Sequence, residues 1–242
     1  MMKQSSTQIT ETCDEYEVYE RLLSLDGMDI LELGCGTADI TRQIATHGNN
    51  RRITATEVDS IQHEKNLLID DLPNVTFVLA GSEAIPSGDT TFDIVFMFKS
   101  LHHVPLELMG QALNEVHRVL RPGGLAYISE PVFQGDFNEI LRLFHDEEAV
   151  REAAFNTTKD AVDKKLFTLR EEVFFNVPLL FEDFDQFDRC IINVTHNDHQ
   201  LSPELYQEVK DRFALKMQSD GAKFLMPIRV DLLRKPNQSR NP

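Results

Sequence analysis

Residues 30–37 read ILELGCGT, and residues 38–45, which follow directly, read ADITRQIA. The first stretch is a short apolar run with one acid, followed by two glycines at Gly-x-Gly spacing. The second stretch carries apolar residues at helical spacing. This order predicts a buried strand, a tight turn and a helix. Glycine in such a turn lets the backbone approach a ligand closely, so the turn is a candidate binding site.

The acid in the first stretch, Glu32, indicates which ligand the turn accepts. Like charges repel, so a carboxylate at the mouth of the turn disfavours a pyrophosphate and favours a ligand with an ammonium group and a sulfonium. The dinucleotide-binding fingerprint also places a third glycine three residues after Gly36, where this chain has Asp39. The turn therefore predicts a site for a small cationic nucleoside, and a nicotinamide reductase is disfavoured.

Short apolar runs alternate with amphipathic stretches through the first half of the chain. This alternation is typical of a doubly wound α/β fold with a parallel sheet. The run at 92–98 is too continuously apolar for an exposed strand and indicates one that is buried on both faces. The expected elements are a helix over 11–25, a βαβ unit over 29–59, a helix over 61–71, strands at 75–79, 92–98 and 125–129, and a helix over 106–120.

Together with the glycine turn, four later segments resemble the motifs of class I S-adenosylmethionine-dependent methyltransferases, in the order of that family. They are residues 52–59 (RITATEVD), 80–86 (AGSEAIP), 91–96 (TFDIVF) and 120–128 (LRPGGLAYI), and the resemblance covers residues 28–135. It implies a mostly parallel seven-stranded sheet with helices on both faces and an antiparallel last strand. It also implies S-adenosylmethionine as cofactor and methyl transfer to a small or medium-sized molecule.

The resemblance assigns the cofactor contacts to loops at the carboxyl ends of the strands. Glu32 would face the ammonium group, while the glycine turn would approach the methionine part and the ribose. The place where the methyl group is presented follows the fourth strand. The expected cofactor-binding residues are Glu32, Gly34, Cys35, Gly36, Glu57, Asp59, Gly81, Ser82, Glu83 and Phe98.

Two positions in this set leave alternatives. A carboxylate at the end of the second strand accepts both ribose hydroxyls, and Asp59 matches the family pattern better than Glu57, which stays the alternative. Members of the family commonly carry aspartate where Gly81 stands, so Ser82 or a backbone carbonyl is expected to accept from the adenine amino group. Ile61 either covers the other face of the adenine ring or belongs to the core.

The acceptor side of the site has no fixed motif, because in-line displacement at a sulfonium needs mainly alignment and exclusion of water. His102 and His103 follow the fourth strand and are the candidate catalytic pair, with helix capping or packing as the alternative. Glu130 and Phe133 follow the fifth strand. The His-x-x-His cluster at 196–199 is a base, a metal site or a polar turn, and it lacks a third ligand at clear spacing. Two tyrosines in the first helix either form a lid or pack on the core: Tyr16 and Tyr19. Four apolar residues after the fifth strand either line a pocket or belong to the core: Phe137, Leu141, Phe144 and Phe155.

After residue 131 the regular alternation of short strands and helices ends. One long helix is expected over 137–154 and a second over 159–175, followed by a strand at 189–194. Ser202 and Pro203 open a further helix, and residues 224–233 alternate as a closing strand. The expected organisation is an N-terminal helical cap (1–28), a cofactor-binding core (29–135), a helical lid or acceptor region (136–186), C-terminal strands and helix (187–235) and a flexible tail (236–242).

The chain has 242 residues and a formal net charge of −16, from 24 basic and 40 acidic side chains. Such a charge repels phosphate backbones, so nucleic acid is not the expected acceptor. No apolar run approaches the roughly 20 residues that cross a bilayer, and the N-terminus lacks an apolar signal core. Cys13, Cys35 and Cys190 show no metal spacing. We expect a cytoplasmic enzyme without a metal, and a non-catalytic binding module or an RNA or protein methyltransferase remains as the alternative.

Overall fold

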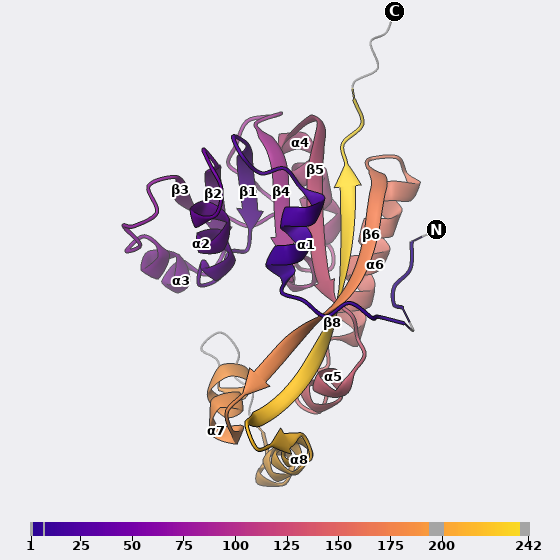
Figure 1. The fold of residues 1–242 in the computed structure, drawn as a ribbon. Coiled ribbons are helices and arrows are strands. Elements are labelled where there is room, and N and C mark those ends of the chain that lie inside the picture. Colours follow the sequence, from indigo (N-terminus) through magenta and orange to yellow (C-terminus); the bar gives the residue numbers. More distant parts are fainter. Residues whose placement is uncertain (1, 7, 194–200, 238–242) are drawn as a thin grey trace, which may run out of the picture.

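The computed structural model describes residues 2–6, 8–193 and 201–237, and its centre is one mixed β-sheet (Figure 1). The strand order is β3-β2-β1-β4-β5-β8-β6, and the short β7 pairs with β8. Neighbours from β3 to β5 are parallel, whereas β8 is antiparallel to both β5 and β6. This confirms the predicted α/β sheet with its antiparallel last strand. The strands are β1 (Asp29–Leu33), β2 (Arg52–Glu57), β3 (Val75–Leu79), β4 (Phe92–Phe98), β5 (Leu120–Pro131), β6 (Thr168–Phe181), β7 (Met217–Gln218) and β8 (Gly221–Arg234).

Helices cover both faces of this sheet. On one face α1 and α2 bury Val18, Tyr19 and Ile44 against the strands, and on the other α4 and α6 bury Val116 and Ala154. None of the helices in the described residues is long and apolar enough to span a membrane. The helices are α1 (Glu15–Leu22), α2 (Asp39–Thr46), α3 (Ser60–Asn66), the 3₁₀ turn η1 (Leu101–His103), α4 (Met109–Val119), α5 (Asp136–Leu141), α6 (Glu148–Asp163), α7 (Phe184–Phe187), the π-helical η2 (Asp188–Ile192) and α8 (Pro203–Ala214).

A second lobe surrounds the far end of the long antiparallel ribbon that β6 and β8 form (Figure 1). Pro131, the last residue of β5, pairs with Ile228, so residues 221–227 of β8 run beyond the carboxyl end of β5. Around this extension α5, α7, η2, α8 and β7 enclose an aromatic core of their own. The lobe therefore lies at the same end of the sheet as the carboxyl ends of the parallel strands. Its buried members are Phe137, Ile140, Phe181, Phe184, Phe187, Ile192, Val209, Phe213, Ala222 and Phe224.

The predictions for the C-terminal half are only partly confirmed. Ser202 does cap α8, because its hydroxyl accepts from the amide of Leu205 at 3.2 Å, and Pro203 stands in the first turn. The single helix over 137–154 is wrong, since α5 ends at Leu141 and α6 begins at Glu148. In the break, the Asp146 carboxylate accepts from the Glu148 amide at 3.1 Å and forms a local turn that starts a new helix.

The helix predicted over 159–175 is also wrong beyond Asp163, because residues 168–181 form β6. The sheet is the reason: Phe175 and its neighbours pair with β8 along the length of the strand, and the Phe175 ring is buried in the core. The register shifts between Leu169 and Glu171, and this bulge interrupts the alternation that reveals a strand in a sequence. The region expected to be a helical lid thus contains an edge strand of the sheet.

The strand predicted at 189–194 is wrong as well. Residues 188–192 continue α7 as the π-helical η2, and residue 194 lies outside the described residues. Asp183 caps this helical segment by accepting from the Gln186 amide at 2.8 Å. Ile192 is buried in the lobe, so its apolar character serves helix packing and not sheet pairing.

Candidate functional site

The candidate site lies where the loops after β1, β2 and β3 meet at the carboxyl ends of the strands. Backbone hydrogen bonds join these loops: the amides of Gly34 and Cys35 donate to the Thr56 carbonyl at 3.0 and 2.8 Å, and the Ala80 amide donates to the Glu57 carbonyl at 3.0 Å. The parallel register that pairs Leu33 with Thr56 sets this arrangement. The sheet therefore brings together three segments that are separate in the sequence.

The two glycines of the turn have different tasks. Gly34 has a φ of +75°, and a Cβ there would lie 2.9 Å from Cβ of Ser100, which itself hydrogen-bonds the Leu33 carbonyl at 2.8 Å. Gly36 has a φ of +52°, and a Cβ there would meet open space within 4 Å. Gly34 thus allows close packing of β1 against the segment after β4, whereas Gly36 leaves bare backbone facing an accessible space.

Glu57, the last residue of β2, faces the turn. One oxygen of its carboxylate accepts from the Gly36 amide at 2.8 Å, and the other accepts from the amides of Val58 and Asp59 at 2.8 and 2.9 Å. The Asp59 side chain is exposed and caps α3 by accepting from the Ile61 amide at 2.8 Å. The carboxylate beside the glycine turn is therefore that of Glu57.

Glu32 lies beneath the turn and is only 2% exposed. Its carboxylate accepts from the Thr41 hydroxyl on α2 at 2.6 Å. Burial, together with the nearby charge of Glu15, raises the pKa of Glu32 to about 7, although the bond from Thr41 and the charge of Lys99 oppose this shift. A buried carboxyl group of this kind is readily ionised by a cation that binds beside it.

Cys35 supports the turn from inside. The Asn66 side-chain amide on α3 donates to the Gly36 carbonyl at 2.8 Å and lies 3.5 Å from the Cys35 sulfur. Burial raises the pKa of the Cys35 thiol to about 12, so the thiol stays protonated. Its side chain therefore belongs to the packing of the turn.

The loop at 80–84 flanks Glu57 on the other side. Ser82 is buried at 9% exposure, Gly81 and Glu83 are partly buried, and Gln111 on α4 fixes the loop by donating to the Glu83 carbonyl at 2.8 Å. Large apolar side chains near this loop are exposed: Val58 at 72%, Ile61 at 66% and Leu79 at 51%. The interpretation of Ile61 as a core residue is wrong. An exposed apolar rim beside polar loops suits a flat heterocycle.

Phe98 and Tyr19 belong to the core between α1 and the sheet, and the partly buried Tyr16 packs against this core. The Phe98 ring is buried and stacks on Phe96 with 4.8 Å between the ring centroids, and both rings contact Tyr19. For Tyr19, the packing alternative is thus the one that the structure shows. Lys99, which follows β4, has its ammonium 2.6 Å from the Glu15 carboxylate and so ties α1 to this edge of the sheet.

The candidate catalytic pair is held by a network of which the sequence indicated only Glu130. His102 is buried and its Nδ1 hydrogen-bonds a Glu130 oxygen, while the other Glu130 oxygen accepts from the Leu101 amide at 2.9 Å. His102 Nε2 lies 3.6 Å from Glu147, which Arg151 holds at 2.5 Å. The His103 ring is exposed and lies 4.1 Å from the His102 ring, centroid to centroid.

Sequence analysis missed Glu147 and Arg151 because it placed position 147 inside a continuous helix, far along the chain from His102. The only available signal was the acidic stretch at 146–148, which is common on helix surfaces. The His-x-x-His cluster at 196–199 lies outside the described residues.

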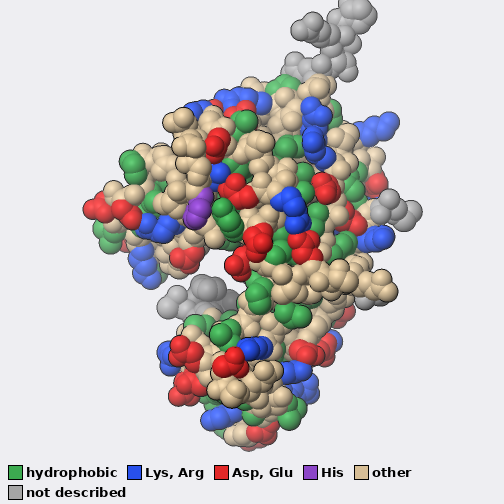
Figure 2. All heavy atoms as spheres, viewed as in Figure 1, with side chains coloured by type: hydrophobic (Ala, Val, Ile, Leu, Met, Phe, Trp, Pro, Cys, Tyr) green, Lys and Arg blue, Asp and Glu red, His purple; other side chains and the backbone are tan. Residues whose placement is uncertain are grey.

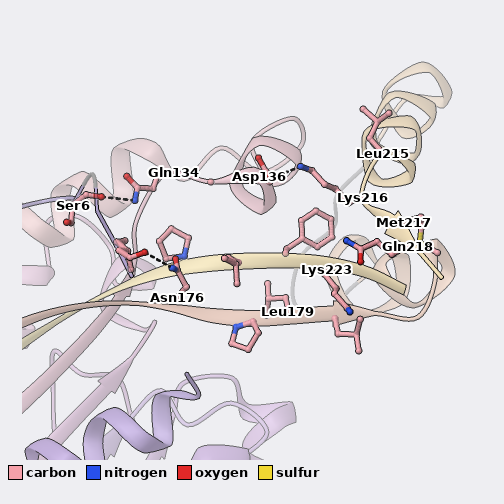
Figure 3. Close-up of a pocket in the computed structure, with 17 residues that line it drawn as sticks. Ser6, Gln134, Asp136, Asn176, Leu179, Leu215, Lys216, Met217, Gln218 and Lys223 are labelled. Carbon is pink, nitrogen blue, oxygen red and sulfur yellow. Dashed lines mark hydrogen bonds and ion pairs between the residues drawn. The ribbon is translucent and has the colours of Figure 1, made fainter. Parts of the chain in front are cut away.

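The surface is hollowed between the core and the lobe, beside the edge where these loops meet (Figure 2). A separate groove of about 1130 Å³ follows the β6–β8 ribbon (Figure 3). Its lining comes from the N-terminal segment, the residues before α5, the ribbon and the α8–β7 connection, and it includes Asn176, Leu179, Lys216 and Lys223. The groove thus lies on the lobe side of the molecule, whereas Glu32, Gly36 and Glu57 lie on β1, β2 and their loops.

Comparison with known proteins agrees with this geometry. Residues 30–124 match the family model described as a methyltransferase domain. The chain is 32% identical over 139 residues to the O-methyltransferase rstn1 of Aspergillus nomiae, covering 54% of this chain and 59% of that protein. It is also 32% identical over 125 residues to the ubiquinone/menaquinone biosynthesis C-methyltransferase UbiE of Hahella chejuensis, covering 50% and 49%. The chain thus spans about half the length of such relatives.

Among solved structures, the YcgJ protein of Bacillus subtilis superimposes with a TM-score of 0.65 at 15% identity, covering 92% of this chain and 98% of that one. At this identity the likeness shows the fold alone. The matched domain and the fold agree: residues 30–124 of this chain are similar to a methyltransferase domain.

Proposed function

We propose that the protein transfers a methyl group from S-adenosylmethionine to a small or medium-sized molecule. The contact between the Glu57 carboxylate and the Gly36 amide carries this proposal. A carboxylate of the kind that accepts ribose hydroxyls thus lies next to backbone without a side chain that borders open space, which supports the proposal. The groups at this edge fit the cofactor: Glu32 suits the ammonium group, Glu57 the ribose hydroxyls, and Val58, Ile61 and Leu79 the faces and edge of adenine.

The methyl acceptor is expected to bind beside η1. This turn begins one residue after Ser100, the residue that packs against Gly34. A nucleophile that carries a proton at neutral pH needs a group to take it. The pair His102 and His103 supplies imidazole nitrogens there, and Glu130 positions His102. Behind His102, the Arg151 side chain bonds Glu147, and its buried Nε has no protein partner among the described residues.

The test is calorimetric titration of the chain with S-adenosylhomocysteine, with NAD⁺ as the control ligand. We expect saturable binding of the nucleoside and none of the dinucleotide. Absence of heat and of a thermal shift at millimolar S-adenosylhomocysteine would refute the cofactor assignment. Transfer of a labelled methyl group to neutral or cationic hydroxyl and amine compounds then tests the reaction. Binding without any transfer would favour the non-catalytic alternative.

The raised pKa of Glu32 predicts that cofactor binding releases a proton. In the free protein the group is about half protonated at pH 7, because its pKa is about 7. An ammonium group beside it stabilises the carboxylate and lowers this pKa, so roughly half a proton should leave on binding at pH 7. Calorimetry in buffers of different ionisation enthalpy measures the number of protons.

The control ligand for this prediction is 5′-methylthioadenosine, which lacks the ammonium group and should release no proton from Glu32. Glu32→Gln should abolish the release by S-adenosylhomocysteine and weaken its binding. Equal proton release by both ligands, or by the variant, would show that Glu32 does not face the ammonium group.

A further inference from the structure

Two segments bring nitrogen and oxygen donors to one point at η1. His102, His103 and Glu147 each offer one donor atom, and these atoms lie within 4.8 Å of one another. Two of the residues come from η1 and the third immediately precedes α6. The sequence spacing predicted no metal site, because 45 residues separate His102 from Glu147. The cluster exists only in the folded chain.

The contacts around His102 fix which of its nitrogens faces the cluster. Glu130 accepts from the Leu101 amide with one oxygen and bonds Nδ1 of His102 with the other. Nδ1 is therefore engaged by Glu130, and Nε2 is the ring nitrogen that faces Glu147, at 3.6 Å. A cation between a ring nitrogen and a carboxylate oxygen at this separation is bound by both. Histidine ligands of metals are typically held by a carboxylate in this way.

Glu147 is oriented from its other side. Arg151 lies 2.5 Å from Oε2, so Oε1 is the oxygen that points toward the histidines. His145 Nε2 is 2.9 Å from the same Oε1 and adds a third imidazole near the point. The carboxylates of Glu130 and Glu147 lie against these imidazoles, and Arg151 bonds the second of them. Buried charge of this kind favours a compensating cation.

We propose that His102, His103 and Glu147 bind a divalent first-row transition metal of the zinc type. Two imidazoles and one carboxylate match the ligands of Zn²⁺ and Co²⁺, whereas Mg²⁺ and Ca²⁺ prefer oxygen alone. The exposed His103 ring gives an ion access to the site and leaves room for a further ligand. In the context of the proposed function, on which this step rests, that ligand is a hydroxyl or carboxylate oxygen of the acceptor. A metal lowers the pKa of a coordinated hydroxyl, so that its proton passes to solvent water, and in this arrangement the two imidazoles act as metal ligands and not as the proton acceptor.

The test titrates the metal-free full chain with Zn²⁺ by calorimetry and with Co²⁺ by visible spectroscopy, with Mg²⁺ as the control ion. We expect saturable binding of Zn²⁺ and Co²⁺, with cobalt bands that show no sulfur charge transfer, and no competition by Mg²⁺. His103→Ala and Glu147→Gln should each weaken the binding by about 10-fold or more. Glu148→Gln is the matched control, since its side chain is 62% exposed and it adjoins Glu147.

His103→Ala keeps the test valid if Glu147→Gln unfolds, because the His103 ring is exposed and its removal leaves the core intact. Absence of Zn²⁺ binding at millimolar metal would overturn the proposal. So would affinity that is unchanged in His103→Ala, or a sulfur-to-cobalt band that assigns the ion to Cys13 or Cys190. The titrations need no cofactor, so failure of S-adenosylhomocysteine to bind would refute the proposed function and leave the metal result independent.

Discussion

Replacing Glu57 with glutamine is expected to weaken S-adenosylhomocysteine binding by about 1.5–3 kcal/mol, or roughly 10- to 150-fold in Kd, which is typical of lost hydrogen bonds to a charged group. A glutamine side chain offers one oxygen where the ribose hydroxyls would meet two. Depending on its orientation, the NH₂ group also faces the backbone N–H of Gly36 or those of Val58 and Asp59, from which it cannot accept a hydrogen bond. Calorimetric titration of the variant measures the change.

Asp59→Asn is the matched control for this experiment. Asparagine is as good a helix cap as aspartate, so α3 should keep its start and the charge alone is lost. We expect its affinity for S-adenosylhomocysteine to stay within about 2-fold of the unchanged chain, well under 1 kcal/mol. The reverse result would be weakened S-adenosylhomocysteine binding by Asp59→Asn and unchanged binding by Glu57→Gln. It would restore the assignment of the ribose to Asp59 that the sequence favoured. The midpoint of thermal unfolding checks that each variant is folded.

Replacing Phe187 with alanine is expected to destabilise the lobe by about 3–5 kcal/mol, the usual range for a buried phenylalanine. Its ring is fully buried and lies 5.0 and 5.2 Å from the rings of Phe213 and Phe181, centroid to centroid. This aromatic core is separate from the two cores that cover the sheet. The lobe should therefore unfold before the sheet in the variant.

Hydrogen exchange followed by mass spectrometry resolves the two parts. Protection of α7 and α8 should fall while β1 and β4 stay protected, and S-adenosylhomocysteine should still bind, because Glu32 and Glu57 stand on the sheet. Leu215→Ala in the same lobe is the control, since its side chain is 83% exposed and its loss should cost less than about 0.5 kcal/mol. Equal loss of protection in β1 and β4 would show that lobe and sheet unfold as one unit.

Much of the fold could be predicted from local patterns in the sequence. The turn at Gly34 and Gly36, the buried run of β4 and the cap at Ser202 each depend on backbone conformation or burial within a few residues. The prediction of a helix beyond Asp163 was wrong for the opposite reason. Residues 168–181 are held as a strand by β8, some fifty residues later, and the bulge near Arg170 hides the alternation. Pairing with a distant segment therefore overrode the local pattern.

The same division holds for the site. The sequence by itself determined the glycine turn, the acid Glu32 and two acids at the end of β2, because these depend on the order of residues within one βαβ unit. The tertiary structure alone decided that Glu57 faces the turn while Asp59 caps α3, since the register of β1 against β2 sets the distance. It alone joined His102, Glu130 and Glu147, because only packing of η1 and α6 beside β5 brings these charges together.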